Sequence, residues 1–205
     1  MADVVFVFGR SNRPLFGDIF TMTSKMLPEI TKSDGYPKIT VANTLVEKFA
    51  NGEIRIVINC NLRGKSVYIF ETADNTPEFS INDYPQSLYL LIDACRRSST
   101  EDITLVIPNH FYAQQDKKDH PPCSNVCKGS RVNFGKNIQV ARIITVDLHT
   151  AQIQGFFDIP VDNIFAIGDL VSHVDMLMSK HDPARYVLIS PNVGGEKRIE
   201  SWHKN

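Results

Sequence analysis

The sequence predicts an α/β protein whose mainly parallel sheet is flanked by helices. Apolar runs rich in β-branched residues recur along the chain, and most are continuous rather than alternating, which is typical of strands buried on both faces. Helix-like stretches lie between these runs, and strands that alternate with helices favour a parallel sheet. The predicted strands span residues 4–8, 54–58, 66–70, 103–107, 142–146 and 186–190.

The most regular predicted helix covers residues 84–97, YPQSLYLLIDACRR. Its apolar residues recur at helical spacing on one face, and they are Leu88, Leu91, Ile92 and Cys95. Asn82 or Asp83 is placed to cap the start of this helix. Residues 120–137 carry proline, glycine, serine and asparagine where the alternation requires a helix, so we expect a loop there.

The composition indicates a globular protein without a general surface for polyanions. Hydrophobic residues make up 42% of the 205 residues and charged residues 22%, with a formal net charge of −1. We therefore expect no nucleic acid partner.

The start of the chain lacks the features of a secretory signal, and no apolar run approaches the roughly 18 residues of a membrane span, so we expect a cytoplasmic protein with no membrane association. Cys123 and Cys127 lack the partners of a zinc site, and free thiols are expected.

Polar residues directly follow the strand predicted at 142–146. Asp147 and His149 are two positions apart, so on a continuing strand both side chains would face the crevice at the carboxyl ends of the strands. Such a pair can hold a divalent cation, orient a phosphate or tune a proton donor. An equally weighted alternative is that Asp147 caps a following helix and His149 packs against it. Asp158 and Asp162 add oxygen ligands suited to Mg²⁺, unless they are solvated loop carboxylates.

A second polar segment follows the strand predicted at 103–107. Two adjacent lysines in it can neutralise a polyphosphate, while its amides and carboxylates can read a base or a ribose; a solvated charge run is the commoner meaning of such a pattern. Phe111 and Tyr112, just before it, supply either a stacking surface or core packing. The segment consists of Gln114, Gln115, Asp116, Lys117, Lys118 and Asp119.

Two further segments carry weaker signals. Asn51-Gly52 before an alternating strand predicts a turn, and Phe49, Asn51 and Glu53 alternate, so all three can face one ligand or a neighbouring subunit. Residues 190–198, SPNVGGEKR, place paired glycines between a predicted strand and a basic segment, which allows close backbone approach to an anion. No dinucleotide-binding or P-loop glycine pattern occurs in the sequence.

Taken together, these segments resemble the phosphoribosyl pyrophosphate synthetase (ribose-phosphate pyrophosphokinase) family. The order FANGE, RGK, IND with LLIDACRR, YAQQDKKD, TVDLHTAQIQGFFDIPVDN and SPNVGGEKR matches the family, and the DLHTAQIQGFFDIPVDN stretch is highly specific to it. The resemblance covers roughly residues 45–119 and 140–200. It implies two phosphoribosyltransferase-like α/β domains, of which residues 1–165 would be the first, ATP-side domain and residues 166–205 an incomplete second one.

The resemblance also implies an activity and its site residues. The family transfers the diphosphoryl group of MgATP to ribose 5-phosphate, which gives phosphoribosyl pyrophosphate for nucleotide biosynthesis, and works as an oligomer. Carried over by position, Gln114 to Asp119 lie in the ATP loop, and Phe49, Asn51 and Glu53 reach the adenine of ATP on a neighbouring subunit. His149 is the implied catalytic residue. The implied Mg²⁺ positions are Asp147, His149, Asp158 and Asp162.

The chain departs from the family pattern in four places. Gln114 replaces the usual arginine of the ATP loop, and Asn192 replaces an aspartate. Residues 120–137 replace an expected helix, and the family's ribose-phosphate loop and flexible-loop lysine find no match before Asn205. We therefore expect weak or no activity from this chain alone, and a truncated gene model or a frame error around 120–137 would explain the departures.

These departures leave a second reading open, in which the chain is a non-catalytic regulatory subunit that associates with full-length synthetase. A phosphoribosyltransferase is disfavoured, because that family's diphosphate-binding signature is also missing.

Overall fold

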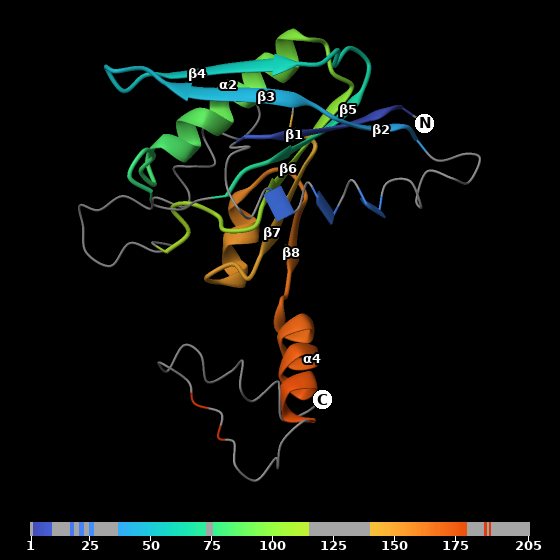
Figure 1. Ribbon diagram of the computed structural model, residues 1–205, viewed down its shortest axis with the longest axis vertical. Coiled ribbons are helices and arrows are strands. Elements are labelled where there is room, and N and C mark those ends of the chain that lie inside the picture. The colour runs from blue at the N-terminus through green and yellow to red at the C-terminus, as the bar shows by residue number, and fades with distance from the viewer. Residues whose placement is uncertain are drawn as a thin grey trace. The chain divides into compact units, whose positions relative to one another are not determined.

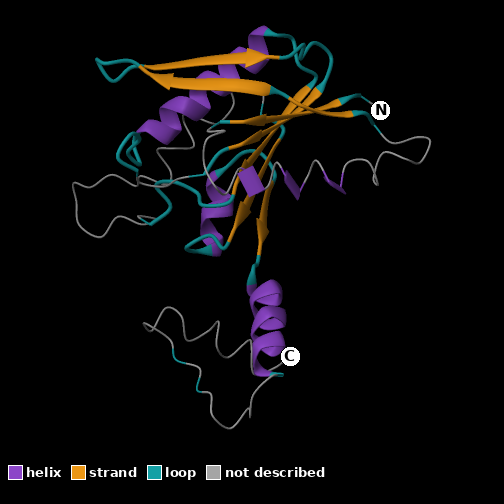
Figure 2. Ribbon diagram, viewed as in Figure 1, coloured by secondary structure: helices purple, strands orange, loops and turns teal. Residues whose placement is uncertain are grey.

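The computed structural model describes residues 2–9, 17–18, 21–22, 25–26, 37–72, 76–114, 140–179, 187 and 189. Its central feature is a six-stranded sheet in the order β2-β1-β5-β6-β7-β8 (Figures 1 and 2). Neighbouring strands from β2 to β7 pair in parallel. The predicted α/β class with a mainly parallel sheet is confirmed. The strands are β1 (Val4–Phe8), β2 (Ile39–Val41), β5 (Ser66–Phe70), β6 (Asp102–Ile107), β7 (Arg142–Val146) and β8 (Val161–Ile164).

The continuous apolar runs form strands that are fully buried on one face of the central sheet and mostly partly buried on the other. Val5, Val7, Val67, Ile69 and Leu105 have no exposed surface. The side chains between them, such as Phe6, Tyr68 and Ile144, are partly buried rather than fully exposed, which accounts for continuous rather than alternating apolar runs. The predicted strands at 4–8, 66–70 and 142–146 have the bounds of β1, β5 and β7, and the one at 103–107 begins one residue earlier as β6.

Helix α2 (Asp83–Arg97) packs its apolar face against β4 and β5. Leu88, Leu91, Ile92 and Cys95 are fully buried, which confirms the spacing argument. Each of the three leucine and isoleucine side chains contributes about 1.5–3 kcal/mol by leaving water. Asn82 occupies the N-cap position, as predicted, but its side chain makes no capping hydrogen bond. The position of the cap is therefore confirmed and its hydrogen bond is not.

The strand predicted at 54–58 exists but does not belong to the central sheet. β4 (Ile54–Asn59) pairs antiparallel with β3 (Asn43–Lys48) in a separate two-stranded sheet. One face of this hairpin packs against the core through Val46, Ile54, Ile56 and Ile58. Figure 1 shows the hairpin and α2 at the same end of the unit.

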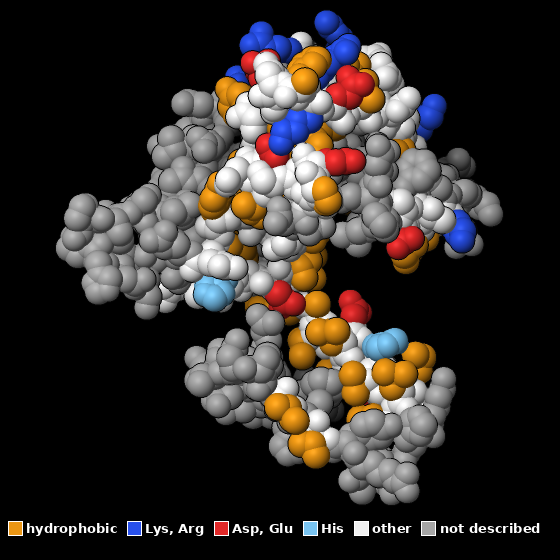
Figure 3. All heavy atoms as spheres, turned by 60° about the vertical axis from the view of Figure 1, so that its left-hand side comes forward, with side chains coloured by type: hydrophobic (Ala, Val, Ile, Leu, Met, Phe, Trp, Pro, Cys, Tyr) orange, Lys and Arg blue, Asp and Glu red, His pale blue; other side chains and the backbone are white. Residues whose placement is uncertain are grey.

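The chain divides into two compact units, residues 1–163 and 164–205. The described part of the second unit contains helix α4 (Ile167–Met178), whose residues are all at least partly exposed. Leu170, Met176 and Leu177 are about half exposed, and Figure 3 shows hydrophobic side chains gathered on this unit. Val187 and Ile189, the described residues of the strand predicted at 186–190, have no regular structure. No helix within the described ranges is long and apolar enough to cross a membrane.

Candidate functional site

Two of the predicted polar segments follow the carboxyl ends of neighbouring strands. β6 and β7 pair in parallel, from Thr104 beside Arg142 to Ile107 beside Thr145. Val146 donates its backbone N–H to the carbonyl oxygen of Pro108 at 3.2 Å, which ties the two strand ends together. Parallel strands end at the same edge of a sheet, so the chain leaves both strands toward the crevice where α/β proteins bind ligands.

The segment after β6 is anchored by its aromatic residues. Phe111 is 1% exposed and belongs to the core, whereas Tyr112 is 39% exposed and donates its hydroxyl hydrogen to Oδ1 of Asn82. Of the pair, only Tyr112 therefore offers a partly open ring. Gln114 is exposed, and residues 115–119, including Lys117 and Lys118, lie outside the described ranges.

His110 is a buried structural histidine rather than a candidate acid or base. Its Nδ1 lies 2.8 Å from the carbonyl oxygen of Phe111, so Nδ1 carries the proton and donates it. Its Nε2 is buried with no hydrogen-bond partner. Burial lowers the pKa of this imidazole more than the Phe111 hydrogen bond raises it, which keeps the ring neutral.

The segment after β7 differs from its expected geometry. The strand ends at Val146, and Asp147 has φ +46°, so the alternation of a strand does not extend to Asp147 and His149. Between them, Leu148 is buried and donates its backbone N–H to Oδ1 of Asn163 at 3.0 Å. Asp147 is partly exposed and His149 exposed. The alternative role of Asp147 as a helix cap also fails, because Thr150 takes the N-cap position of the following 3₁₀ helix η1 (Ala151–Phe156).

The two remaining carboxylates of the predicted Mg²⁺ set lie on and just before β8. Asp158 is exposed, and Asp162 forms an ion pair with Arg142 at 2.5 Å. In the described part of the chain, no three His, Cys, Asp or Glu residues are grouped so that they hold a metal ion. A cation bound to Asp162 would have to compete with the Arg142 guanidinium, so the donor chemistry fits Mg²⁺ better at Asp147 than at Asp162.

The predicted turn between β3 and β4 is confirmed. Phe49 donates its N–H to the carbonyl of Glu53 and Gly52 donates to that of Phe49, both at 2.8 Å. The Asn51 side chain accepts from the N–H of Glu53 at 3.1 Å, and Gly52 has φ +92°, which glycine adopts at little cost. Phe49, Asn51 and Glu53 are all exposed, so this turn presents all three side chains to solvent.

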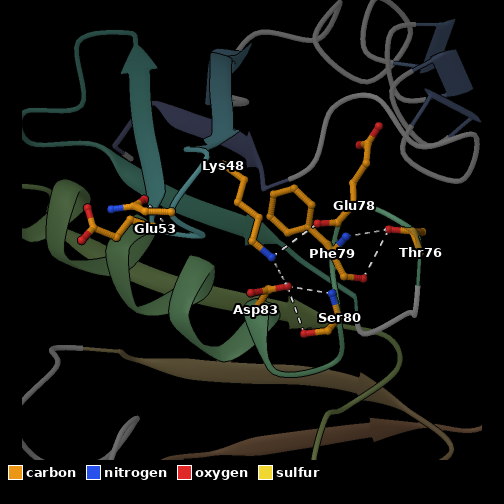
Figure 4. A network of polar contacts seen from close by, with 8 residues as sticks. Lys48, Glu53, Thr76, Glu78, Phe79, Ser80 and Asp83 are labelled. Atoms are coloured by element: carbon orange, nitrogen blue, oxygen red, sulfur yellow. Dashed lines mark hydrogen bonds and ion pairs between the residues drawn. The ribbon is translucent and has the colours of Figure 1, made fainter.

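A polar network at the base of this turn was not predicted (Figure 4). Nζ of Lys48 lies 2.8 Å from Oδ2 of Asp83, and the same oxygen accepts from the N–H of Ser80 at 2.7 Å. Burial alone would raise the pKa of the Asp83 carboxyl, but the hydrogen bonds from Lys48 and Ser80 and the Lys48 charge lower it overall. The Ser80-x-x-Asp83 spacing was a local signal for part of this network, whereas nothing local indicates Lys48, 35 residues earlier.

A buried carboxylate at the ends of β1 and β5 was also missed. Glu71 is 0% exposed; it accepts from the Ser87 hydroxyl at 3.2 Å and from the Thr72 N–H at 3.3 Å. The Thr72 hydroxyl oxygen in turn accepts from the N–H of Asn109, which joins the end of β5 to the segment after β6. A glutamate directly after an apolar strand was the available signal.

Several expectations fall outside the described residues. They are the loop at 120–137, the cysteines Cys123 and Cys127, and the SPNVGGEKR segment with Asn192. In the described ranges, Cys60 and Cys95 are free thiols.

Comparison with known proteins connects this arrangement to one family. Residues 4–129 match the family model described as the N-terminal domain of ribose phosphate pyrophosphokinase. Ribose-phosphate pyrophosphokinase A of Dictyostelium discoideum is 40% identical over 156 residues, which cover 76% of this chain and 47% of that protein. Ribose-phosphate pyrophosphokinase of Helicobacter pylori (strain ATCC 700392 / 26695) is 37% identical over 194 residues, covering 94% and 54%.

A solved structure shows the same likeness. The crystal structure of phosphoribosylpyrophosphate synthetase from Mycobacterium smegmatis superposes with a TM-score of 0.79 at 28% sequence identity, covering 98% of this chain and 60% of that one. The chain thus spans about half the length of the curated relatives it matches.

Proposed function

Because the chain belongs to the ribose-phosphate pyrophosphokinase family, we propose that it supplies the ATP side of diphosphoryl transfer from MgATP to ribose 5-phosphate in the cytoplasm. The product is phosphoribosyl pyrophosphate, a precursor for nucleotide biosynthesis. The observation that carries this proposal is that the segments containing Gln114 and Asp147–His149 both follow the carboxyl ends of the paired parallel strands β6 and β7.

ATP is proposed to contact two parts of the chain. Gln114 and the following residues to Asp119 would line its phosphates and ribose, with the two lysines at 117 and 118 neutralising phosphate charge. Phe49, Asn51 and Glu53 would meet the adenine of ATP on a neighbouring subunit, within a homo-oligomer or a hetero-oligomer with full-length synthetase. The exposure of the Phe49 ring, 49%, supports this role, because a stacking surface must be open.

The metal is proposed to arrive with the nucleotide rather than to sit in a cage of protein ligands. Mg²⁺ usually binds one or two carboxylates together with substrate phosphates, and it neutralises the charge that develops during transfer. The absence of a preformed cluster in the described residues is compatible with this mode. Asp147 and His149 are the proposed contacts, with His149 orienting the transferring group. Asp158 and Asp162 remain predicted metal positions, and the Asp162 carboxylate is paired with Arg142.

Calorimetric titration with MgATP tests the proposal. We expect the wild-type chain to bind MgATP and His149→Ala to bind it more weakly. Equal binding of both would remove His149 as a ground-state contact. For these 205 residues alone we expect AMP formation from ATP and ribose 5-phosphate below about 1 s⁻¹, because no segment of the sequence matches the family's ribose-phosphate loop. Faster turnover would refute that expectation.

A second function is favoured by one observation, the neutral Gln114 at an exposed position of the ATP loop. A subunit with weakened phosphate contacts would join catalytic synthetase and alter its regulation. Co-purification with a full-length synthetase and a changed response of that enzyme to phosphate or ADP would support this function. Independent migration of the two proteins and an unchanged response would refute it.

A further inference from the structure

The start of helix α2 touches both chain segments that are proposed to contact ATP. Asp83 binds Lys48, the last residue before the Phe49–Glu53 turn, and Asn82 accepts a hydrogen bond from Tyr112, two residues before Gln114. These partners lie 35 and 30 residues away in sequence. Two adjacent residues therefore connect a hairpin outside the central sheet with a loop that leaves it.

The connection to the hairpin consists of several contacts of one ammonium group. Nζ of Lys48 lies 2.8 Å from the Asp83 carboxylate, 3.4 Å from the carbonyl oxygen of Glu78 and 5.4 Å from the centre of the Phe79 ring. Phe79 is itself 6% exposed, so its ring is a fixed surface rather than a mobile one. Figure 4 shows the Lys48 side chain reaching from the hairpin to this segment.

The Asp83 carboxylate is held in turn by its own segment. Its Oδ2 accepts from the Ser80 N–H at 2.7 Å and from the Ser80 hydroxyl at 3.0 Å, and the Asp83 N–H donates to the Ser80 carbonyl at 3.0 Å. The acceptor is thus oriented before Lys48 reaches it. A preoriented carboxylate loses less side-chain entropy in forming an ion pair than a free one does.

This ion pair differs from an ordinary surface pair in its burial. The Lys48 and Asp83 side chains are 30% and 17% exposed, whereas those of Arg97 and Asp93, an ion pair of similar length on the same helix, are 79% and 35% exposed. Exposed pairs contribute little because solvent screens them. Of these two ion pairs, we therefore expect the Lys48–Asp83 pair to hold the hairpin in place against the start of helix α2.

We propose that Asn82 and Asp83 are positioning residues. Together they hold the Phe49–Glu53 turn and the approach to the ATP loop, from Tyr112 to Gln114, in fixed positions relative to the start of helix α2. This inference rests on the proposed function. Asp83 acts through Lys48 on the Phe49–Glu53 turn, and Asn82 acts through Tyr112 on the approach to Gln114. Neither residue needs to touch the nucleotide.

MgATP and MgGTP binding by calorimetry tests the Asp83 arm. We expect Asp83→Asn and Lys48→Met to weaken MgATP binding about tenfold, and to reduce the preference for MgATP over MgGTP, because the turn that meets the base is no longer held. Lys48→Arg keeps the ion pair and should retain wild-type binding. The matched control is Asp93→Asn, which makes the same chemical change on the same helix and should leave both affinities within about twofold of wild type.

Tyr112→Phe tests the Asn82 arm in the same way, because it removes only the hydroxyl that Asn82 holds. We expect weaker MgATP and MgGTP binding together, since this arm positions the phosphate loop rather than the base contact. Hydrogen exchange without nucleotide adds a direct readout: segment 43–59 should exchange faster in Asp83→Asn than in Asp93→Asn.

The outcomes separate this inference from the function on which it rests. If the wild-type chain binds no MgATP, the proposed function fails and the inference with it. If Phe49→Ala weakens MgATP binding but Asp83→Asn behaves as Asp93→Asn does, in affinity and in exchange, only the inference fails. Equal loss of MgATP and MgGTP in Asp83→Asn, with a lowered melting temperature, would show a general role in folding and would also overturn it.

Discussion

Replacing Gly9 with alanine should be strongly destabilising, because a side chain there has no room. Gly9 directly follows β1, and a Cβ built on it would lie 2.0 Å from Oε2 of Glu71, 2.7 Å from its Cδ and 3.1 Å from Cδ1 of Leu91. A flexible carboxylate at a surface would swing aside. Glu71 is 0% exposed, so it has only the packed interior into which to move.

Two costs contribute to the magnitude. Forcing a methyl group into a packed core costs about 1–3 kcal/mol. Displacing Glu71 also breaks its hydrogen bonds from Ser87 and Thr72, and a buried polar group left unsatisfied costs about 1–3 kcal/mol more. We therefore expect Gly9→Ala to lower the free energy of unfolding by about 2–6 kcal/mol, a large share of the roughly 5–15 kcal/mol of an ordinary domain.

Urea unfolding followed by far-ultraviolet circular dichroism measures this change. Gly155→Ala is the control, since a Cβ at Gly155 meets nothing within 4 Å, and its effect should stay below about 1 kcal/mol. In a Glu71→Ala background, Gly9→Ala should cost much less, because the clashing carboxylate is gone. A loss for Gly9→Ala no larger than that for Gly155→Ala would refute the steric argument.

Three further predictions follow from buried or strained groups. Burial lowers the pKa of His110, so below the unfolded value of 6.5 the unfolded chain binds a proton at this residue that the folded chain does not bind. The free energy of unfolding, measured with urea, should therefore fall from pH 7 to pH 5. In His110→Phe this decrease should be smaller. Asp83 does not affect this pH range, because its pKa is lowered in the folded chain and its contribution to stability is lost only below about pH 3.8. Burial raises the pKa of Cys95 to about 12, so peptide mapping after iodoacetamide at pH 8 should find Cys95 unmodified in the folded chain, and rapid modification would contradict its burial. Gly52→Ala should destabilise the hairpin by about 1 kcal/mol because φ there is +92°, and unchanged hydrogen exchange in residues 43–59 would count against this.

The central strands and α2 were predictable because their signals are local. Ser66–Phe70 and Arg142–Val146 are apolar β-branched runs, and the period of Leu88, Leu91 and Cys95 is helical. The partner of Ile54–Asn59 was not predictable. Asn43–Lys48 carries asparagine, threonine, glutamate and lysine, so its strand character depends on pairing with β4 rather than on its own composition.

The residues of the candidate site remain predictions, and the backbone that carries Asp147 and His149 differs from the expected strand. Asp147 and His149 do follow a central strand, yet the turn at Asp147 to positive φ is set by the burial of Leu148 and by Asn163, neither of which a spacing rule includes. Asn82 has the chemistry of a helix cap and equally that of an acceptor for Tyr112. Only the folded arrangement decides between these two uses, because Tyr112 is distant in sequence.

The short run Asp147-Leu148-His149 is ordered before any ligand meets it. Leu148 anchors the middle of the run in the core, its N–H is hydrogen-bonded to Asn163, and Asp147 adopts a positive φ. A segment with so little conformational freedom has little left to lose on association. When Asp147 and His149 bind a ligand, the entropic cost of ordering this segment has therefore already been offset during folding.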